Sequence, residues 1–372
     1  HAADHTFLIP VFFEGEHLFT AAVKAHQADC GNSQPTTYFA AATDVYHEGA
    51  LIFPCVQVQS DYRDNQDIIR MCRRRIRVPD QWYGDYLAAM GAARIGERRL
   101  KEFIGKYGKG AVRKFVADWF DYSERRTAEA IRALPGGAIS ATGVHDPILP
   151  FLPDGIHIKV DIDIDSADGR IKVDLRDNPD SVDAGLNLTE ATATMSAAQA
   201  VFCCLDSDIP HNSGSFRRLE ILLRENCVTG IPRFPHSCSV ATTNMTDTII
   251  NTIQAGFAQL GDGYGFSQGN MCNGAGTGVC SGKDWRLGGA PYVNQMFMSA
   301  GGMPASARND GMHGMVNPVS AGLVYRDSIE VNEQRFPFQV QSVRALEDSC
   351  GAGRRRGGPA SEVIMGPRNE PM

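Results

Sequence analysis

The most regular alternation of apolar and polar residues in the chain runs from residue 156 to residue 175. Isoleucine or valine occupies every second position from Ile156 to Ile164, and the pattern resumes from Ile171 to Leu175 after the pair Asp168-Gly169. A period of two places these side chains on one face of a β-strand, and an Asp-Gly pair is typical of a hairpin turn. The pattern therefore predicts an antiparallel hairpin with one buried face.

A helical period replaces this alternation between Trp82 and Leu134, where apolar residues recur three or four positions apart. Gly108 and Gly110 interrupt the period, and Pro135-Gly136-Gly137 ends it. We expect two helices that form a helical hairpin. Two further segments, 189–205 and 239–260, are predicted to form helices rich in small residues.

Shorter apolar runs predict strands at 7–13, 18–23, about 217–224 and 321–346. Gly, Asn, Met and Ser dominate the segment 261–315, which is predicted to form hairpins and loops. The expected fold class is α+β, with mixed and antiparallel sheets, a helical hairpin and small-residue-rich helices. We expect three regions. They are strands and loops carrying a candidate metal site (1–80), the helical hairpin region (81–150), and an α+β region with glycine-rich loops (151–372).

Composition excludes several classes of protein. The 372 residues are 43% hydrophobic and 21% charged, as in ordinary globular proteins, and a net charge of −7 gives no support to nucleic-acid or polybasic membrane binding. No run approaches the roughly 20 apolar residues of a membrane span, and no secretion signal is visible. The ten cysteines are scattered and include no C-x-x-C pair. We therefore expect a cytoplasmic protein with reduced thiols.

The first candidate for chemistry is a pair of H-x-x-D units, which contribute His1 and Asp4, then His26 and Asp29. Imidazole and carboxylate ligands suit zinc, manganese or iron, and a hairpin between the two units brings its ends together. The pattern predicts a divalent metal site, in which His5 is an alternative to His1. Surface polar residues and turn caps would give the same pattern without a metal.

A glycine-rich segment, 261–282, is the second candidate. No G-x-x-x-x-G-K-[ST] pattern occurs in the chain, and GAGTGV at 274–279 lacks the preceding strand and following helix of a dinucleotide fingerprint. We therefore expect no phosphate-binding loop here. Neutral hydrogen-bonding side chains in and before this segment are candidate substrate-binding groups, namely Asn212, Asn244, Gln268 and Asn270.

Seven sequence blocks, in a fixed order, resemble the hydantoinase B/oxoprolinase family, which is shared by 5-oxoprolinases, hydantoinases, caprolactamases, and the acetone and acetophenone carboxylases. The blocks are HAAD with AHQAD, DVYHEGALIFP (44–54), GDYLAAMGAARIGERRL (84–100), DYSERR (121–126), DSDIPHNSGSFRRLEI (206–221), AGLVYRDSIEVNEQRFP (321–337) and GAGRRRGG (351–358).

The resemblance implies that His1, Asp4, His26 and Asp29 are the metal ligands. It also implies a hetero-oligomer, in which a partner subunit of the hydantoinase A type binds ATP with Mg²⁺ and phosphorylates the substrate. The chain departs from the family pattern at Gln27, where relatives often carry a further histidine. A family segment with an Asp-Pro-Tyr motif is expected before His1 and another stretch after Met372, so we expect the chain to be incomplete at both ends.

A further block, GGAPYVNQMFMSAGG (288–302), and the block at 321–337 resemble the ketone carboxylases of the acetone or acetophenone type more than the oxoprolinases. The resemblance implies a reaction that joins an activated enol to CO₂ derived from bicarbonate. One alternative is an ATP-dependent cyclic amide hydrolase acting on oxoproline, a hydantoin or a lactam. Another is a non-catalytic scaffold subunit with a structural metal. His47 and Glu48 are candidates for general acid or base catalysis because they lie close in sequence to the metal motif.

Overall fold

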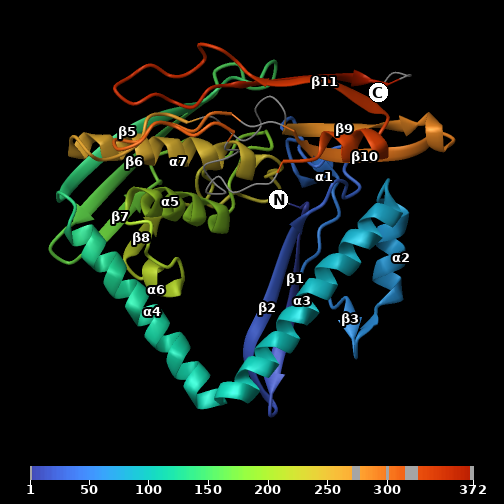
Figure 1. The fold of residues 1–372 in the computed structure, drawn as a ribbon, viewed down its shortest axis with the longest axis horizontal. Helices are drawn as coiled ribbons and strands as arrows, with labels where there is room; N and C mark the ends of the chain where they lie inside the picture. The colour runs from blue at the N-terminus through green and yellow to red at the C-terminus, as the bar shows by residue number, and fades with distance from the viewer. Residues whose placement is uncertain (1, 270–276, 299–300, 315–325, 369–372) are drawn as a thin grey trace.

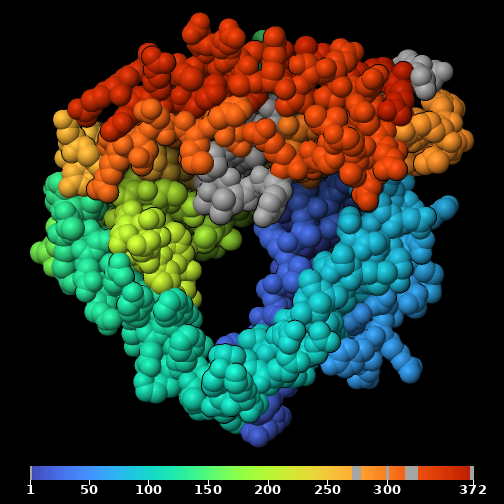
Figure 2. Space-filling model, in the orientation of Figure 1, coloured from blue at the N-terminus to red at the C-terminus, as the bar shows by residue number. Residues whose placement is uncertain are grey.

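Two hydrophobic cores, joined by a pair of long helices, organise the chain (Figure 1). The computed structural model describes residues 2–269, 277–298, 301–314 and 326–368. Figure 2 shows an opening through the molecule between the two halves. The fold is α+β, as the alternation of periods in the sequence predicts.

The first core is built on a long hairpin. Strand β1 (Asp4–Phe13) pairs antiparallel with β2 (Glu16–His26), and alternate β1 residues are buried. This face packs on α3 (Pro79–Tyr107), where Phe7 and Ile9 meet Trp82, Tyr86 and Met90. The remaining elements of this half are α1 (Val45–Glu48), β3 (Gln59–Ser60), β4 (Arg63–Asp64) and α2 (Gln66–Arg75).

A four-stranded sheet forms the base of the second core. Its order is β5-β6-β7-β8, antiparallel except for the parallel pair β7–β8, with bounds β5 (Gly137–His145), β6 (Ile156–Asp165), β7 (Arg170–Asp174) and β8 (Leu219–Leu222). The alternate β6 side chains from Ile156 to Ile164 are all buried. The predicted hairpin is thereby confirmed, whereas β5 has no counterpart in the sequence prediction.

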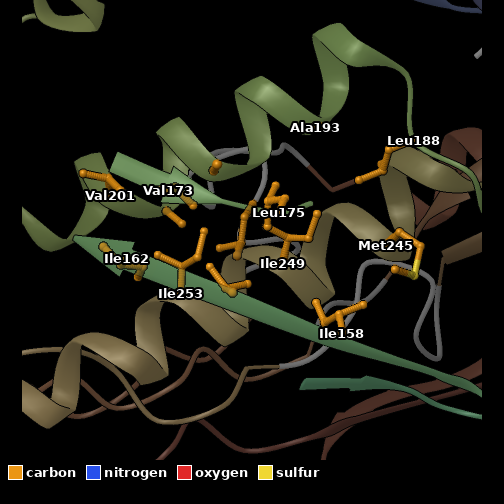
Figure 3. Packing of buried hydrophobic residues seen from close by; sticks show 14 of the residues in the cluster. Ile158, Ile162, Val173, Leu175, Leu188, Ala193, Val201, Met245, Ile249 and Ile253 are labelled. Carbon is orange, nitrogen blue, oxygen red and sulfur yellow. The ribbon is translucent and has the colours of Figure 1, made fainter. Parts of the chain in front are cut away.

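Two helices bury this sheet, as Figure 3 shows for Ile249 and Ile253 against Ile162 and Val173. They are α5 (Glu190–Cys204) and α7 (Met245–Gly256), which pack together. Small side chains on α5, including Ala193, bury completely and allow this close approach. Short helices complete this half, namely α6 (Ser213–Phe216), η1 (Ala241–Thr243) and η2 (Phe257–Leu260).

The helices α3 and α4 (Lys109–Arg132) join the two halves at Gly108, whose φ of +83° falls outside the range that a helix allows. Both predicted helices and the break are confirmed. The helices diverge from Gly108 at an open angle (Figure 1) because α3 buries its apolar face on the β1–β2 hairpin and α4 packs against α6 and the sheet.

The C-terminal part adds two more hairpins across the top of Figure 1. One pairs β9 (Thr277–Asp284) with β10 (Ala290–Phe297) around η3 (Trp285–Leu287), and the other pairs β11 (Phe338–Ala345) with β12 (Ser361–Pro367). The single strand predicted over 321–346 is wrong in part, because α8 (Ile329–Arg335) starts where Ser328 caps it. Residues 321–325 of that prediction lie outside the described residues.

None of the described helices is both long and apolar enough to span a membrane.

Candidate functional site

Asp4 and His26 face each other at the open end of the β1–β2 hairpin, where the strand register pairs them directly. The Oδ1 atom of Asp4 lies 3.6 Å from Nδ1 of His26, and the two side chains are 19% and 21% exposed. The other ring nitrogen of His26, Nε2, is 2.9 Å from Oγ1 of buried Thr37. Nδ1 is therefore the ring nitrogen that faces Asp4.

The ring of His26 is also held from its face. Tyr38 stacks on it, with ring centroids 4.9 Å apart and an interplanar angle of 12°. The Tyr38 hydroxyl in turn accepts a hydrogen bond of 2.5 Å from Nε2 of Gln295, on strand β10. Residues from distant parts of the chain therefore fix the orientation of one imidazole.

Asp4 is ionised in this environment. Burial acts to raise its pKa, but the interaction with His26 and the charge of Lys24 outweigh burial and hold the pKa below the usual value. The site therefore pairs a carboxylate with an imidazole, two kinds of ligand that zinc, manganese and iron accept.

His5 and Cys30 lie behind this pair and are buried. Burial lowers the pKa of His5 to about 4, so its imidazole is neutral at pH 7. Its Nε2 atom lies 3.5 Å from the Sγ atom of Cys30. Burial raises the pKa of the Cys30 thiol, and the charges of Asp29, Glu48 and Asp4 raise it further. Cys30 is therefore a thiol at neutral pH, not a nucleophilic thiolate.

Asp29 has a different set of contacts from Asp4. Its carboxylate is fully buried and accepts hydrogen bonds from the side chain and the backbone N–H of Arg77, both at 2.7 Å, and from Gly31 N–H at 3.3 Å. Arg77 lies two residues after the end of α2. The described contacts therefore tie Asp29 to the loop after α2.

His47 and Glu48 point to different surroundings although they are adjacent in α1. His47 is exposed, and its Nδ1 accepts from Thr43 N–H at 3.3 Å. Glu48 is only 5% exposed and accepts a 2.7 Å hydrogen bond from Ser237. Burial raises the pKa of Glu48 although the Ser237 hydroxyl acts in the opposite direction. Glu48 therefore holds a proton more readily than an exposed carboxyl group does.

The candidate substrate-binding residues are spread over the second half. Asn212 caps α6 and donates to Ser123 at 2.7 Å, and Asn244 donates to Nε2 of buried His145 at 3.1 Å. Gln268 is exposed. Asn270 lies outside the described residues, as does His1 from the predicted ligand set. The described contacts of Asn212 and Asn244 are therefore with α4 and β5, respectively.

The donor set at the hairpin end fits part of a metal site. Across residues 2–269, 277–298, 301–314 and 326–368, no three His, Cys, Asp or Glu side chains are arranged to hold a metal ion. However, two ligands of one tetrahedral zinc ion lie about 3.4 Å apart, which is close to the separation of the Asp4 and His26 atoms. The pair would supply two ligands, with the others from elsewhere.

Sequence patterns did not indicate several residues of this site. Thr37, Tyr38 and Ser237 lie outside the recognised sequence blocks, and Gln295 lies in the block at 288–302 without any role that the sequence assigned to it. Ser237 and Gln295 come from more than 180 residues beyond the hairpin. They hold His26 and Glu48 through contacts that only the folded chain creates.

Comparisons with known proteins agree with this architecture. The sequence model of the family described as hydantoinase B/oxoprolinase matches residues 1–371. The B-type subunit of a putative D-/L-hydantoinase from a Pseudomonas species is 29% identical, over 97% of this chain and 60% of that protein. The acetophenone carboxylase delta subunit of Aromatoleum aromaticum is 22% identical, over 98% of this chain and 53% of that protein. The chain thus spans less than two thirds of these relatives.

Two solved structures share the fold. The ATP-dependent caprolactamase of Pseudomonas jessenii superposes with a TM-score of 0.85 and 23% identity, covering 98% of this chain and 62% of that one. A nucleotide-free acetone carboxylase superposes with a TM-score of 0.86 and 16% identity, covering 98% of this chain and 49% of that one.

Proposed function

Because the chain belongs to the hydantoinase B/oxoprolinase family, we propose that it is the metal-bearing part of an ATP-dependent enzyme acting on a small carbonyl compound. The observation that carries the proposal is the Asp4–His26 pair, in which a low-pKa carboxylate faces an oriented imidazole. His1 is the proposed third ligand. Asp29 is kept as a candidate ligand, although its described contacts are with Arg77 and Gly31.

A divalent zinc, manganese or iron ion bound here would polarise a carbonyl or phosphoryl oxygen of the substrate. The chain's own residues would perform the remaining tasks. Thr37 and Tyr38 fix the ring of His26. Glu48, with its raised pKa, is the proposed proton carrier. His47 is a second proposed acid or base, reached from solvent.

Substrate activation is assigned to a second subunit. The chain has no P-loop pattern, and the relatives bear the names of enzyme subunits. We propose a hydantoinase A-type partner that binds ATP with Mg²⁺ and phosphorylates the substrate, in a hetero-oligomer. The opening beside the β1–β2 hairpin (Figure 2) leaves one face of this hairpin accessible to such a partner.

Two reactions are proposed, each supported by a separate observation. Identity to the hydantoinase subunit, 29%, exceeds the 22% to the acetophenone carboxylase subunit, which favours ring opening of a cyclic amide. The sequence blocks at 288–302 and 321–337 favour carboxylation of a ketone. Bicarbonate separates the two, because only the carboxylase consumes it.

The test is metal analysis of the complex purified from its native source, followed by assays of ATP hydrolysis with cyclic amides and with ketones, each with and without bicarbonate. We expect about one divalent ion per chain, which is lost in His26→Ala together with activity. His17→Ala is the matched control because this exposed histidine at the far end of the hairpin contacts Thr20. A His26→Ala complex that lost its metal but kept full activity would instead indicate a scaffold subunit with a structural metal.

A further inference from the structure

A polar cavity of about 470 Å³ lies between the start of α3, strand β10 and helix α8. Its size is within the range of small-molecule sites. Six of its lining residues carry the argument, namely Gln81, Asp85, Asn294, Asp327, Asn332 and Arg335.

The inner wall of the cavity is a hydrogen-bonded network of two side-chain amides and the carboxylate of Asp327. Asn332 is only 6% exposed; its Nδ2 donates to Oδ2 of Asp327 at 3.1 Å, and its Oδ1 accepts from Asn294 at 3.3 Å. The same Asp327 oxygen accepts from the backbone N–H of Phe297 at 3.0 Å. Because these groups hold one another, the wall presents ordered polar atoms without rearrangement, as a specific site requires.

Two opposite charges on the walls are not used by the fold. Neither Asp85 nor Arg335 makes a side-chain ion pair or hydrogen bond with any residue in the described part of the chain, although both line the same cavity. Both side chains are exposed to water, and partial burial still raises the pKa of the Asp85 carboxyl. A ligand that carries both charges would compensate both groups.

We propose that this cavity binds a small zwitterion, whose carboxylate pairs with Arg335 and whose ammonium group pairs with Asp85. A guanidinium binds a carboxylate through two parallel hydrogen bonds, which favours a carboxylate over other anions of similar size. Gln81 and Asn294 contact the part of the ligand between its two charged ends.

The cavity adjoins the candidate metal site. Gln295 lines the cavity and its side chain donates to Tyr38, which stacks on His26. Opening a lactam ring breaks the amide C–N bond, with water supplying a hydroxyl to the carbonyl carbon and a proton to nitrogen, and leaves an amine and a carboxylate on one molecule. The identification of the zwitterion with such a product rests on the proposed ring-opening function, whereas its binding does not.

Isothermal titration calorimetry on the native complex, without ATP, tests the proposal. The probes are 6-aminohexanoate, hexanoate and hexan-1-amine, which share a chain length but differ in charged ends. We expect 6-aminohexanoate to bind at least about tenfold more tightly than either singly charged probe. Arg335→Gln and Asp85→Asn should each weaken its binding by about tenfold or more, and Arg335→Lys by less.

Arg74→Gln is the matched control, since this exposed arginine lies on α2 and does not line the cavity. Circular dichroism and urea midpoints verify that each variant is folded. The proposal is overturned when 6-aminohexanoate gives no saturable binding, when hexanoate binds equally well, or when Arg335→Gln binds like the parent. If the complex turns over substrate in a metal-dependent reaction but does not bind 6-aminohexanoate, only the zwitterion proposal is overturned. If it binds 6-aminohexanoate but has no turnover, only the proposed function is overturned.

Discussion

Asp4 and Asp29, the aspartates of the two H-x-x-D units, differ in their exposure to solvent and in the group that each one faces. Asp4 is partly exposed and faces an imidazole, whereas Asp29 is buried against a guanidinium. A buried carboxylate is tolerated only where hydrogen bonds and an opposite charge replace water. The contacts of Asp29 meet this requirement and give it a structural role that can be measured.

Asp29→Ala should lower the free energy of unfolding by about 3 kcal/mol, because it leaves the partly buried guanidinium of Arg77 without its partner. Urea denaturation at pH 7 measures this change. Asp67→Ala is the control, since Asp67 pairs with Arg70 on the exposed surface, where such pairs contribute little. An Asp29→Ala protein that is as stable as the parent but has lost its metal would identify Asp29 as a ligand instead.

His5 makes the free energy of unfolding depend on pH. Burial lowers its pKa from 6.5 to about 4, so between these values the unfolded chain binds a proton that the folded chain does not. The contribution of His5 to stability is therefore complete above pH 6.5 and decreases as the pH falls towards 4. The full difference corresponds to about 3 kcal/mol.

His5→Gln should flatten the stability profile over this range. Urea denaturation of the metal-free protein at a series of pH values from about 7 down to about 5 measures the profile. The change is expected below the pKa of His5 in the unfolded chain, 6.5, and above its pKa in the folded chain, about 4. His157→Gln is the control because His157 lies exposed on the outer side of β6. Parallel profiles for His5→Gln and the parent would contradict the assignment of a buried neutral imidazole.

At the scale of elements, the β6–β7 turn is placed directly against α4. Gly169 in this turn has a φ of +71°, and an added Cβ would lie 2.8 Å from the backbone oxygen of Ala128 in α4. This backbone conformation is strained for a residue with a side chain, and the contact with Ala128 leaves no room for one. The turn therefore fixes how closely the sheet and the long helix approach.

Gly169→Ala should be less stable than Gly15→Ala by about 1 kcal/mol or more. Gly15 is the matched comparison because its φ is +79° but an added Cβ would meet no atom within 4 Å. Both substitutions strain the backbone, so the difference isolates the contact with α4. Urea denaturation of the two variants in parallel measures it, and equal stabilities would show that α4 moves away at no cost.

At the scale of the whole molecule, the two cores meet behind the candidate metal site. Ser239, from the second half, accepts a 3.0 Å hydrogen bond from Phe39 N–H and donates to the carbonyl of Thr37 at 3.3 Å. Thr37 in turn contacts His26. The position of the imidazole therefore depends on how the halves are held together.

Ser239→Ala should weaken the binding of zinc by up to about tenfold, because residues behind a ligand orient it. Competition with a chromogenic chelator measures the affinity. Ser140→Ala is the control, since Ser140 bonds Asp161 on the exposed side of the sheet. Reduced stability with unchanged zinc affinity would mean that Ser239 joins the halves without orienting His26.

Local patterns in the sequence determined much of the framework. The alternation from Ile156 to Ile164 specifies a strand because every second side chain must leave water. The two long helices and the break at Gly108 follow from their periodicity in the same way. The spacing of the H-x-x-D units also placed Asp4 and His26 at facing ends of one hairpin, since a hairpin is a local structure.

Tertiary structure alone decided what these residues contact. Contacts between segments up to 257 positions apart hold Glu48 and Tyr38 in place. A contact between distant segments also places Arg77 against Asp29. The open angle of α3 and α4 and the hydrogen bond from Asn212 to Ser123 have the same origin. Contacts of this kind arise from the packing of two separate cores, and a local pattern records which side chains are buried but not which distant side chains they meet.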